Sequence, residues 1–320
     1  MTKLKNLVSR VLPVFGILLF VFILYRVGLS SIWENLKTIN LFYFGISIAI
    51  LVPLLFLKAY KWGRILQSFG FSYSLLESFK VLLISYYVGS ITPARLGDFS
   101  RALYLKEHQI PLTKAFSSVL IDRIFDLGIL ILMAGASVFV FANVFSLAYS
   151  NLFLILLLAL IFATGVLLIL KKNLMRKLLR PFFYMAIPEK YQQKLINVFD
   201  DFYGSILSFS KSLPALFFLS GLTVLTWFVS FLSIYFVALS IGLNLNFFIL
   251  VLILPFTTLV ESLPISFSGI GTRDAVLIFM LSFLSIPASQ AVSFSVLILV
   301  LNYVMNFFGA ILWIKKPFKF

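Results

Sequence analysis

The sequence predicts an all-helical protein that crosses a membrane several times, and three observations lead to this prediction. Of the 320 residues, 62% are hydrophobic and only 12% are charged, which is more apolar surface than a soluble domain can bury. The apolar residues stand in long unbroken runs, whereas a transmembrane barrel would need short alternating segments. The Lys and Arg residues are concentrated in a few short clusters between these runs. We therefore expect one integral membrane domain over residues 1–320.

Six runs are long enough to cross the hydrocarbon layer, which takes about 20 apolar residues in a helix. They are expected at about 11–27, 41–58, 117–142, 145–170, 214–240 and 289–314. Two further regions, 75–106 and 247–285, each contain two apolar arms joined by a stretch of Pro, Gly and charged residues. Each pair of arms forms either a re-entrant, broken hairpin or two full crossings, and the sequence leaves both alternatives open.

Positive charge gives the expected orientation, because Lys and Arg in short loops stay on the cytoplasmic side. When the N-terminus is placed inside, only Arg26 and Lys37 fall in external loops. The other clusters then lie inside: Lys3, Lys5 and Arg10; Lys58, Lys61 and Arg64; 171–180; and 315–319. We expect a multi-pass protein of the cell membrane with both termini in the cytoplasm.

The order of the spans predicts an inverted repeat. Each of two units, 11–142 and 145–314, reads as helix, helix, hairpin, helix and makes an odd number of net crossings. The two hairpins then enter from opposite faces, and their tips meet near the midplane, as in many transporters. The alternative is two ordinary loops. Between the spans at 145–170 and 214–240, segment 171–211 is expected to form a cytoplasmic basic loop and an amphipathic helix.

The two hairpin turns repeat the same ingredients, "ITPARLGDFSR" at 91–101 and "SLPISFSGIGTRD" at 262–274. Two prolines are expected to end a helical arm, and three glycines to allow the chain to reverse: Pro93 and Pro264; Gly97, Gly269 and Gly271. A backbone turn at membrane depth needs protein or a wet cavity around it. The turns are therefore predicted to line a polar site.

Charged residues follow each turn and suggest a site for a lipid headgroup. Arg95, Arg101 and Arg273 are expected to hold a phosphate, since a guanidinium can donate two parallel hydrogen bonds to it. Asp98 and Asp274 stand close to these arginines. They either take part in binding or simply neutralise the arginines, and both alternatives remain open.

A further set of charged residues lies within or beside apolar segments, where charge is expensive and marks a functional path or a structural pair. We expect these residues to form a supporting polar network: Glu77, Lys80, Asp122, Arg123, Asp126 and Glu261. Glu77 and Lys80 are spaced to pair along one helix face, and Asp122 and Asp126 are spaced to share one.

Several function classes find no support in the sequence. Cys is absent and His108 is the one histidine, so neither a thiolate nucleophile nor a His-rich metal site is expected. No nucleotide-binding or hydrolase motif occurs, so we expect no cofactor, no metal and no enzyme activity. The formal net charge of +15 suits anionic lipid headgroups and does not require nucleic acid.

Three segments resemble one known family. "TPARLGDFSRALYL" (92–105) is similar to the P-x-R-x-G-E-x-x-R-A segment of the lysylphosphatidylglycerol synthase transmembrane, or flippase-like, family. "IDRIFDL" (121–127) and "SLPISFSGIGTRDAVL" (262–277) are similar to its E-R-x-x-D-L and L-P-I-S-P-G-G-x-G-x-R-E-A segments. Aspartate stands at 98, 122 and 274 where the family usually has Glu, and "SFSG" replaces its Pro-Gly-Gly turn.

The resemblance implies a flippase-like protein that handles lipids without synthesising them, since the synthase domain is not found in the sequence. The expected function is translocation of polar or anionic lipids between leaflets, either aminoacyl-phosphatidylglycerol-like or linked to polyprenyl phosphate. One alternative is a non-transporting membrane partner of a glycosyltransferase or lipid-modifying enzyme. Another is an intramembrane headgroup transferase. The expected partners are membrane lipids, and the sequence does not specify an oligomeric state.

Overall fold

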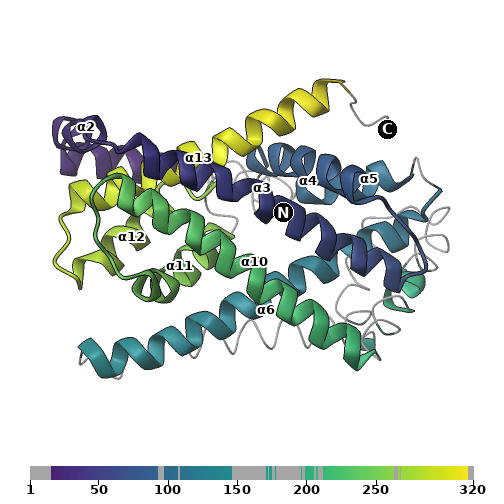
Figure 1. Ribbon diagram of the computed structural model, residues 1–320. Coiled ribbons are helices and arrows are strands. Elements are labelled where there is room, and N and C mark those ends of the chain that lie inside the picture. Colours follow the sequence, from purple (N-terminus) through teal and green to yellow (C-terminus); the bar gives the residue numbers. More distant parts are fainter. Residues whose placement is uncertain are drawn as a thin grey trace.

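The fold of the described chain is entirely helical (Figure 1), as predicted. The computed structural model describes residues 16–92, 97–106, 109–145, 171, 173–174, 177, 196, 199–204, 207, 212–262, 266 and 268–315. Within these residues, three helices of 28 residues are long and apolar enough to cross a membrane: α3 (Leu41–Ser68), α10 (Leu213–Ser240) and α13 (Ala288–Lys315). A bent pair of helices, Gly16–Val27 and α2 (Leu29–Lys37), passes the same criterion together. The chain is a multi-pass helical membrane protein.

Where the structure describes them, the observed helices match the predicted spans, and α3 (Leu41–Ser68) and α6 (Leu112–Phe145) extend beyond them by several residues. The spans expected at 214–240 and 289–314 are α10 and α13, and the span at 117–142 lies within α6 (Leu112–Phe145). The expected span at 145–170 falls outside the described residues, apart from residue 145 at the end of α6. The span at 41–58 is ten residues too short, because α3 continues to Ser68.

The extension of α3 corrects the prediction that Lys58, Lys61 and Arg64 form a loop cluster. All three residues lie inside the helix. No proline interrupts the last three turns, and Trp62 and Ile65 are fully buried on the inner face of the helix. Packing of this face continues the helix through the charged residues, since tertiary burial provides most of a helix's stability.

A second correction concerns residues 28–40, which were expected to form an external loop. Helix α2 occupies most of this segment and makes an angle of 83° with the preceding helix. Gly28 has a φ of 87°, which a residue with a side chain rarely adopts, and so permits the bend. Ile32 of α2 packs against Ile23 and against Val292 of α13. The span prediction missed this helix because it has only nine residues, which is too short for a membrane crossing.

Two helical hairpins have arms too short to cross a bilayer. The first consists of α4 (Leu75–Ser90) and α5 (Ser100–Lys106), and the second of α11 (Phe247–Glu261) and α12 (Thr272–Ser282). At about 1.5 Å per residue these arms are roughly 10 to 24 Å long, against a hydrocarbon thickness of about 30 Å. Of the two alternatives left open by the sequence, the structure therefore has the broken hairpins.

The hairpins enter the bundle from opposite ends and touch inside it (Figure 1). The first hairpin begins just after the C-terminal end of α3. The second begins after Ser240 of α10, whose carbonyl oxygen accepts a 2.7 Å hydrogen bond from the N–H of Asn40 at the opposite end of α3. Inside the bundle, the Ser268 hydroxyl donates to the backbone oxygen of Ser90 over 3.1 Å. The turn of the second hairpin thus contacts the end of α4.

Glycines bring the hairpins close to the long helices. A Cβ atom on Gly309 of α13 would lie 2.2 Å from the carbonyl oxygen of Leu83 in α4, so the two helices cross with almost no gap. At the second turn, a Cβ atom on Gly271 would lie 2.0 Å from the carbonyl oxygen of Gly16. Gly271 also has a φ of 82°. Both positions require the absence of a side chain.

The division into repeat units 11–142 and 145–314 stays a prediction. Much of segment 171–211 lies outside the described residues. Residues 199–204 are helical, as the pattern predicted, and Tyr203 is buried there. Phe202 packs against an apolar cluster formed by α3, α6 and α10. This part of the segment therefore rests on the protein.

Candidate functional site

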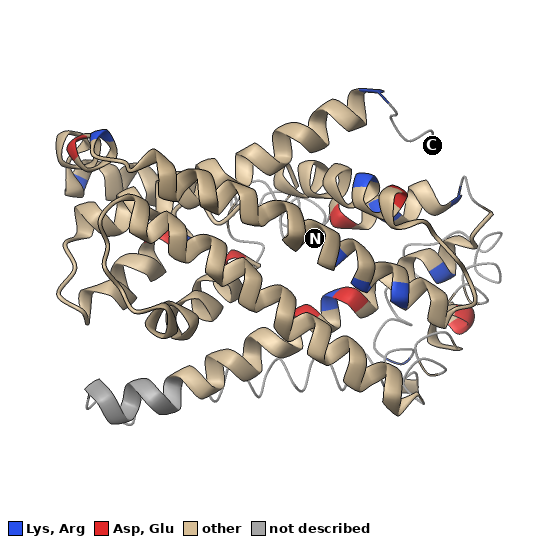
Figure 2. Cartoon of the chain, in the orientation of Figure 1, with Lys and Arg blue, Asp and Glu red and all other residues tan. Residues whose placement is uncertain are grey.

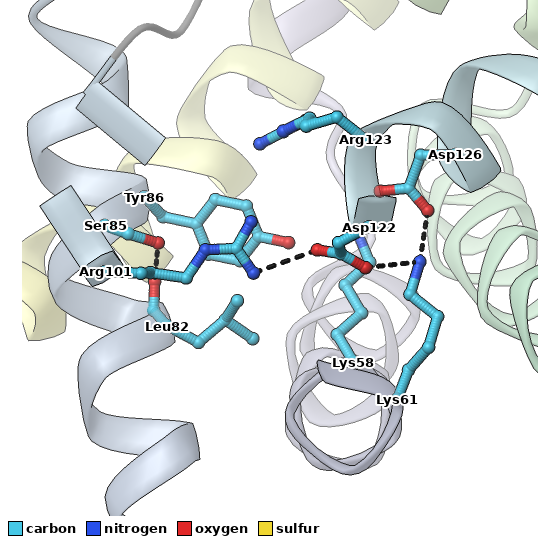
Figure 3. Close-up of a pocket in the computed structure, with 9 residues that line it drawn as sticks. All are labelled: Lys58, Lys61, Leu82, Ser85, Tyr86, Arg101, Asp122, Arg123 and Asp126. Atoms are coloured by element: carbon cyan, nitrogen blue, oxygen red, sulfur yellow. Dashed lines mark hydrogen bonds and ion pairs between the residues drawn. The ribbon is translucent and has the colours of Figure 1, made fainter. Parts of the chain in front are cut away.

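A buried ion network joins α3 to α6 (Figure 3). The ammonium of Lys61 lies 2.8 Å from Oδ1 of Asp122 and 2.5 Å from Oδ1 of Asp126. Lys61 is 1% exposed, and these carboxylates are the charged partners that a buried Lys residue usually needs. The two aspartates are one helical turn apart and share a face, as predicted. Each of them reaches the same cation from α6.

The first hairpin completes this network. Arg101 of α5 donates from Nη1 to Oδ2 of Asp122 over 2.9 Å, and its Nε donates to the backbone oxygen of Asp98 over 3.3 Å. Arg123 of α6 forms an ion pair with the carboxylate of Asp98. The Arg101 guanidinium also lies 5.2 Å from the ring centre of Trp62 in α3. Three helices and the turn before α5 are thereby tied together.

The network is electrically balanced. Three basic side chains (Lys61, Arg101 and Arg123) face three carboxylates (Asp98, Asp122 and Asp126). A charge buried without a partner would be strongly unfavourable, whereas the charges of these six residues cancel. Lys and Arg gather with Asp and Glu toward the end of the bundle where α5 ends and α6 begins (Figure 2).

A small polar pocket lies within this network (Figure 3). It has a volume of about 10 Å³ and lies between α3, α4, α5 and α6. Its lining combines the charged side chains with groups of α4: Lys58, Lys61, Leu82, Ser85, Tyr86, Arg101, Asp122, Arg123 and Asp126.

A larger cavity of about 90 Å³ adjoins the small pocket. It lies between α3, α4, α10, α11 and α13, and Lys58 and Tyr86 line both spaces. Its remaining polar lining includes Trp227, Ser230, Ser233, Thr258, Glu261, Ser262 and Asn302. Apolar side chains such as Leu54 and Leu301 complete the walls. Apolar walls with a few convergent polar groups are typical of the lining of ligand sites.

Lys58 stands where the two spaces meet. Its ammonium lies 5.5 Å from the ring centre of Tyr86 and 5.2 Å from that of Trp227. Within the described part of the chain, no carboxylate lies within ion-pair distance of it. Lys58 therefore differs from Lys61, one turn further along α3, whose charge is neutralised twice.

Two charged residues of the second hairpin, Arg273 and Asp274, make contacts that position α12. Arg273 of α12 is 2% exposed; its Nε donates to the Ser295 hydroxyl over 3.0 Å and its Nη2 to the Ser295 carbonyl over 3.1 Å. Asp274 accepts a 2.7 Å hydrogen bond from the N–H of Gly271 and so caps the start of α12. Its carboxylate is also 3.8 Å from Arg273. Arg273 thus joins α12 to α13, and neither residue lines the two cavities described above.

The structure brings together some of the predicted site residues and separates others. Asp98, Arg101, Asp122, Arg123 and Asp126 form one network, while Arg273 and Asp274 lie in the second hairpin. Glu261 lines the larger cavity. Glu77 and Lys80 pair over 2.8 Å as predicted, but both side chains are more than one-third exposed and line neither cavity.

The turn residues are partly described. A Cβ atom on Gly97 would lie 2.3 Å from the carbonyl group of Val88. Position 97 therefore requires glycine, as predicted, because the turn packs closely against α4. Gly269 has a φ of 76°, as expected for a reversal, and Gly271 is described above. Pro93, Arg95 and Pro264 lie outside the described residues.

Sequence reasoning missed Lys58, Lys61, Tyr86 and Trp227 as site residues. The two lysines were assigned to a loop, and the two aromatic residues were taken as ordinary interfacial side chains. A signal was present for the lysines, because they continue the three- and four-residue spacing of the apolar face that begins with Leu51 and Leu54.

Comparison with known proteins agrees with this architecture. The chain is 26% identical to the UPF0104 membrane protein MJ1595 of Methanocaldococcus jannaschii, over 95% of this chain and 94% of the relative. It is 27% identical to the UPF0104 membrane protein MJ1078 of the same organism, over 71% and 93%. A similar protein of Pyrococcus horikoshii, the UPF0104 membrane protein PH1989, is 21% identical over 95% and 96%.

No solved structure was found to match the chain. A family model described as "Lysylphosphatidylglycerol synthase TM region" matches residues 7–309, which is nearly the whole chain. The family suggested by the three motifs is thereby confirmed, and the chain belongs to the family of the lysylphosphatidylglycerol synthase transmembrane region.

Proposed function

We propose that this protein translocates lipids with polar or anionic headgroups between the two leaflets. The observation that carries the proposal is the lining of the larger cavity, a space of about 90 Å³ where a cation, a carboxylate and several hydroxyl and amide groups meet inside an apolar helical bundle. The headgroup would occupy this cavity while the acyl chains stay in the surrounding lipid. The role is transport rather than chemistry, and the partners are the membrane lipids themselves.

The broken hairpins support this role. Helix ends expose backbone groups without helical partners, and such groups are tolerated at membrane depth only beside protein or a wet cavity. The C-terminal end of α11 contributes Glu261 and Ser262 to the larger cavity. Polar atoms are thus available at a depth where a continuous apolar helix would offer none.

The proposed orientation places the N- and C-termini in the cytoplasm of a cell membrane. The gathering of Lys and Arg toward the end of the bundle where α5 ends and α6 begins supports it, because positive charge near membrane-spanning segments is retained on the cytoplasmic side (Figure 2). The first hairpin would then open from the cytoplasm and the second from the outside.

A liposome assay tests the proposal. Purified protein is reconstituted with headgroup-labelled phosphatidylglycerol or a labelled polyprenyl phosphate, and the label in the outer leaflet is quenched by a reagent that cannot cross the membrane. We expect the protein to accelerate exchange of label between leaflets relative to protein-free liposomes.

A matched pair of variants links activity to the cavity. Asn302→Trp adds a large side chain to the cavity lining, whereas Tyr303→Trp places the same side chain at an exposed position next to it in sequence. Exchange should fall in the first variant and persist in the second. If folded wild-type protein exchanges neither lipid, transport is refuted and the alternative of a non-transporting membrane partner is favoured.

A further inference from the structure

We propose that Lys58, held between Tyr86 and Trp227, is the cation that binds the phosphate of the lipid headgroup. This inference rests on the proposed function and deepens it. Among the described residues, Arg101 and Arg273 already have partners in the fold, whereas Lys58 faces the cavity. The expectation for Arg95, which lies outside the described residues, stays a prediction.

In the part of the chain that the structure describes, the other cations that line the small pocket are engaged in the fold. Lys61 contacts two carboxylates, and Arg101 contacts Asp122 and the backbone of Asp98. Arg123 pairs with Asp98. A phosphate that recruited any of these residues would have to break a buried ion pair and leave a carboxylate unpaired, which is strongly unfavourable. These residues position the helices, and their charges cancel.

Lys58 is different because its contacts are with aromatic rings. Its ammonium lies 5.5 Å from the ring centre of Tyr86 and 5.2 Å from that of Trp227, and the side chain is half-buried. A cation–π contact is weaker than a desolvated ion pair, and it leaves N–H groups of the ammonium available to an anion. An anion can therefore bind without displacing a carboxylate.

The position of Lys58 matches this role. It lines both the small pocket and the larger cavity, so an anion bound to it would sit at their junction. Trp227 supplies a second donor, because its buried indole N–H has no hydrogen-bond partner in the described residues. Glu261 lines the same cavity, but no ion pair joins it to Lys58. The ammonium of Lys58 and the unused indole N–H of a lining residue are the two donors available here to the oxygens of a phosphate ester.

Titration calorimetry in detergent solution tests the assignment with three probes: dioctanoyl-phosphatidylglycerol, dioctanoylglycerol and inorganic phosphate. We expect wild-type protein to bind the first probe and to bind the other two at least tenfold more weakly. Lys58→Met should weaken binding of the first probe at least tenfold, equivalent to about 1.4 kcal/mol. Lys58→Arg should bind this probe within about threefold of wild type, because it keeps the positive charge.

Two further variants sharpen the test. Lys114→Met is the matched control, because Lys114 is also half-buried and lies 5.4 Å from the ring centre of Phe69, yet lines neither cavity. It should bind like wild type. Trp227→Phe keeps an aromatic ring and removes only the N–H, and it should weaken binding measurably. This second variant tests the site even if Lys58→Met fails to fold.

The outcomes separate the inference from the proposed function. Wild-type binding of the phospholipid together with unchanged binding by Lys58→Met and Trp227→Phe would overturn the inference and leave transport standing. Inorganic phosphate binding as tightly as the phospholipid would show a free-anion site and overturn the lipid assignment. Failure of the wild-type protein to bind or exchange any phospholipid would refute the proposed function and the inference with it.

Discussion

Removing the ammonium of Lys61 should destabilise the protein more than any change of an exposed ion pair. Lys61 lies 2.8 Å from Asp122 and 2.5 Å from Asp126 and is 1% exposed. At an effective dielectric constant of about 20, one such contact corresponds to about 6 kcal/mol of Coulomb energy, most of which offsets the desolvation of both ions. Loss of one partner from a buried pair costs about 3–5 kcal/mol, and we expect this range for Lys61→Met.

Equilibrium unfolding in mixed detergent micelles measures this difference. Lys37→Met is the control, because Lys37 and Glu34 form a 2.7 Å pair with both side chains more than half exposed. Such a pair contributes about 0–1 kcal/mol. The double variant Lys61→Met/Asp126→Leu should recover much of the loss, since it removes the carboxylate that Lys61→Met leaves uncompensated. A free energy of unfolding for Lys61→Met within about 1 kcal/mol of that for the Lys37 control would refute the reasoning.

Three further predictions follow from the hairpins. Gly309→Leu should lower the free energy of unfolding by at least about 1–3 kcal/mol through overpacking against α4, whereas Gly221→Leu, at a position with open space around it, should have little effect in the same unfolding assay. Cysteines introduced together at Ser90 and Ser268 should be joined by a short bifunctional thiol reagent, and mass spectrometry should find no such product in either single variant; a lack of cross-linking would contradict the contact between the hairpins. Arg273→Met removes two hydrogen bonds to α13 and should lower the unfolding temperature without weakening phospholipid binding in calorimetry, and a selective loss of binding would instead place Arg273 in the site.

Much of this fold could be predicted from hydropathy and charge, because the bilayer imposes a length and a composition on every crossing. The starts of α3, α10 and α13 fall within a residue of the predicted spans. The end of α3 could not be predicted in this way, since its last turns are held by burial of Trp62 and Ile65 against other helices rather than by lipid. Helix α2 was missed for a related reason: it has only nine residues, and only one of them, Ile32, is buried.

The candidate site was predicted less completely than the fold. Spacing alone showed that Asp122 and Asp126 share a face and that Glu77 reaches Lys80. Spacing could not show that Arg101 is neutralised by Asp122, because that contact depends on how the first hairpin packs against α6. The sequence identified which residues are charged, while three-dimensional packing decides which of these charges are already paired.

The contact between the two hairpin turns also bears on how the protein would experience a membrane voltage. The potential falls mainly across the layer that water and ions cannot enter, and water reaching the Ser268–Ser90 contact from each side would make that layer thinner than the bilayer. A charge that passed only from one side of this contact to the other would cross most of the potential, gaining or losing about 2.3 kcal/mol per 100 mV. Movement of an anionic headgroup over a few ångströms would thus be electrically equivalent to a full crossing.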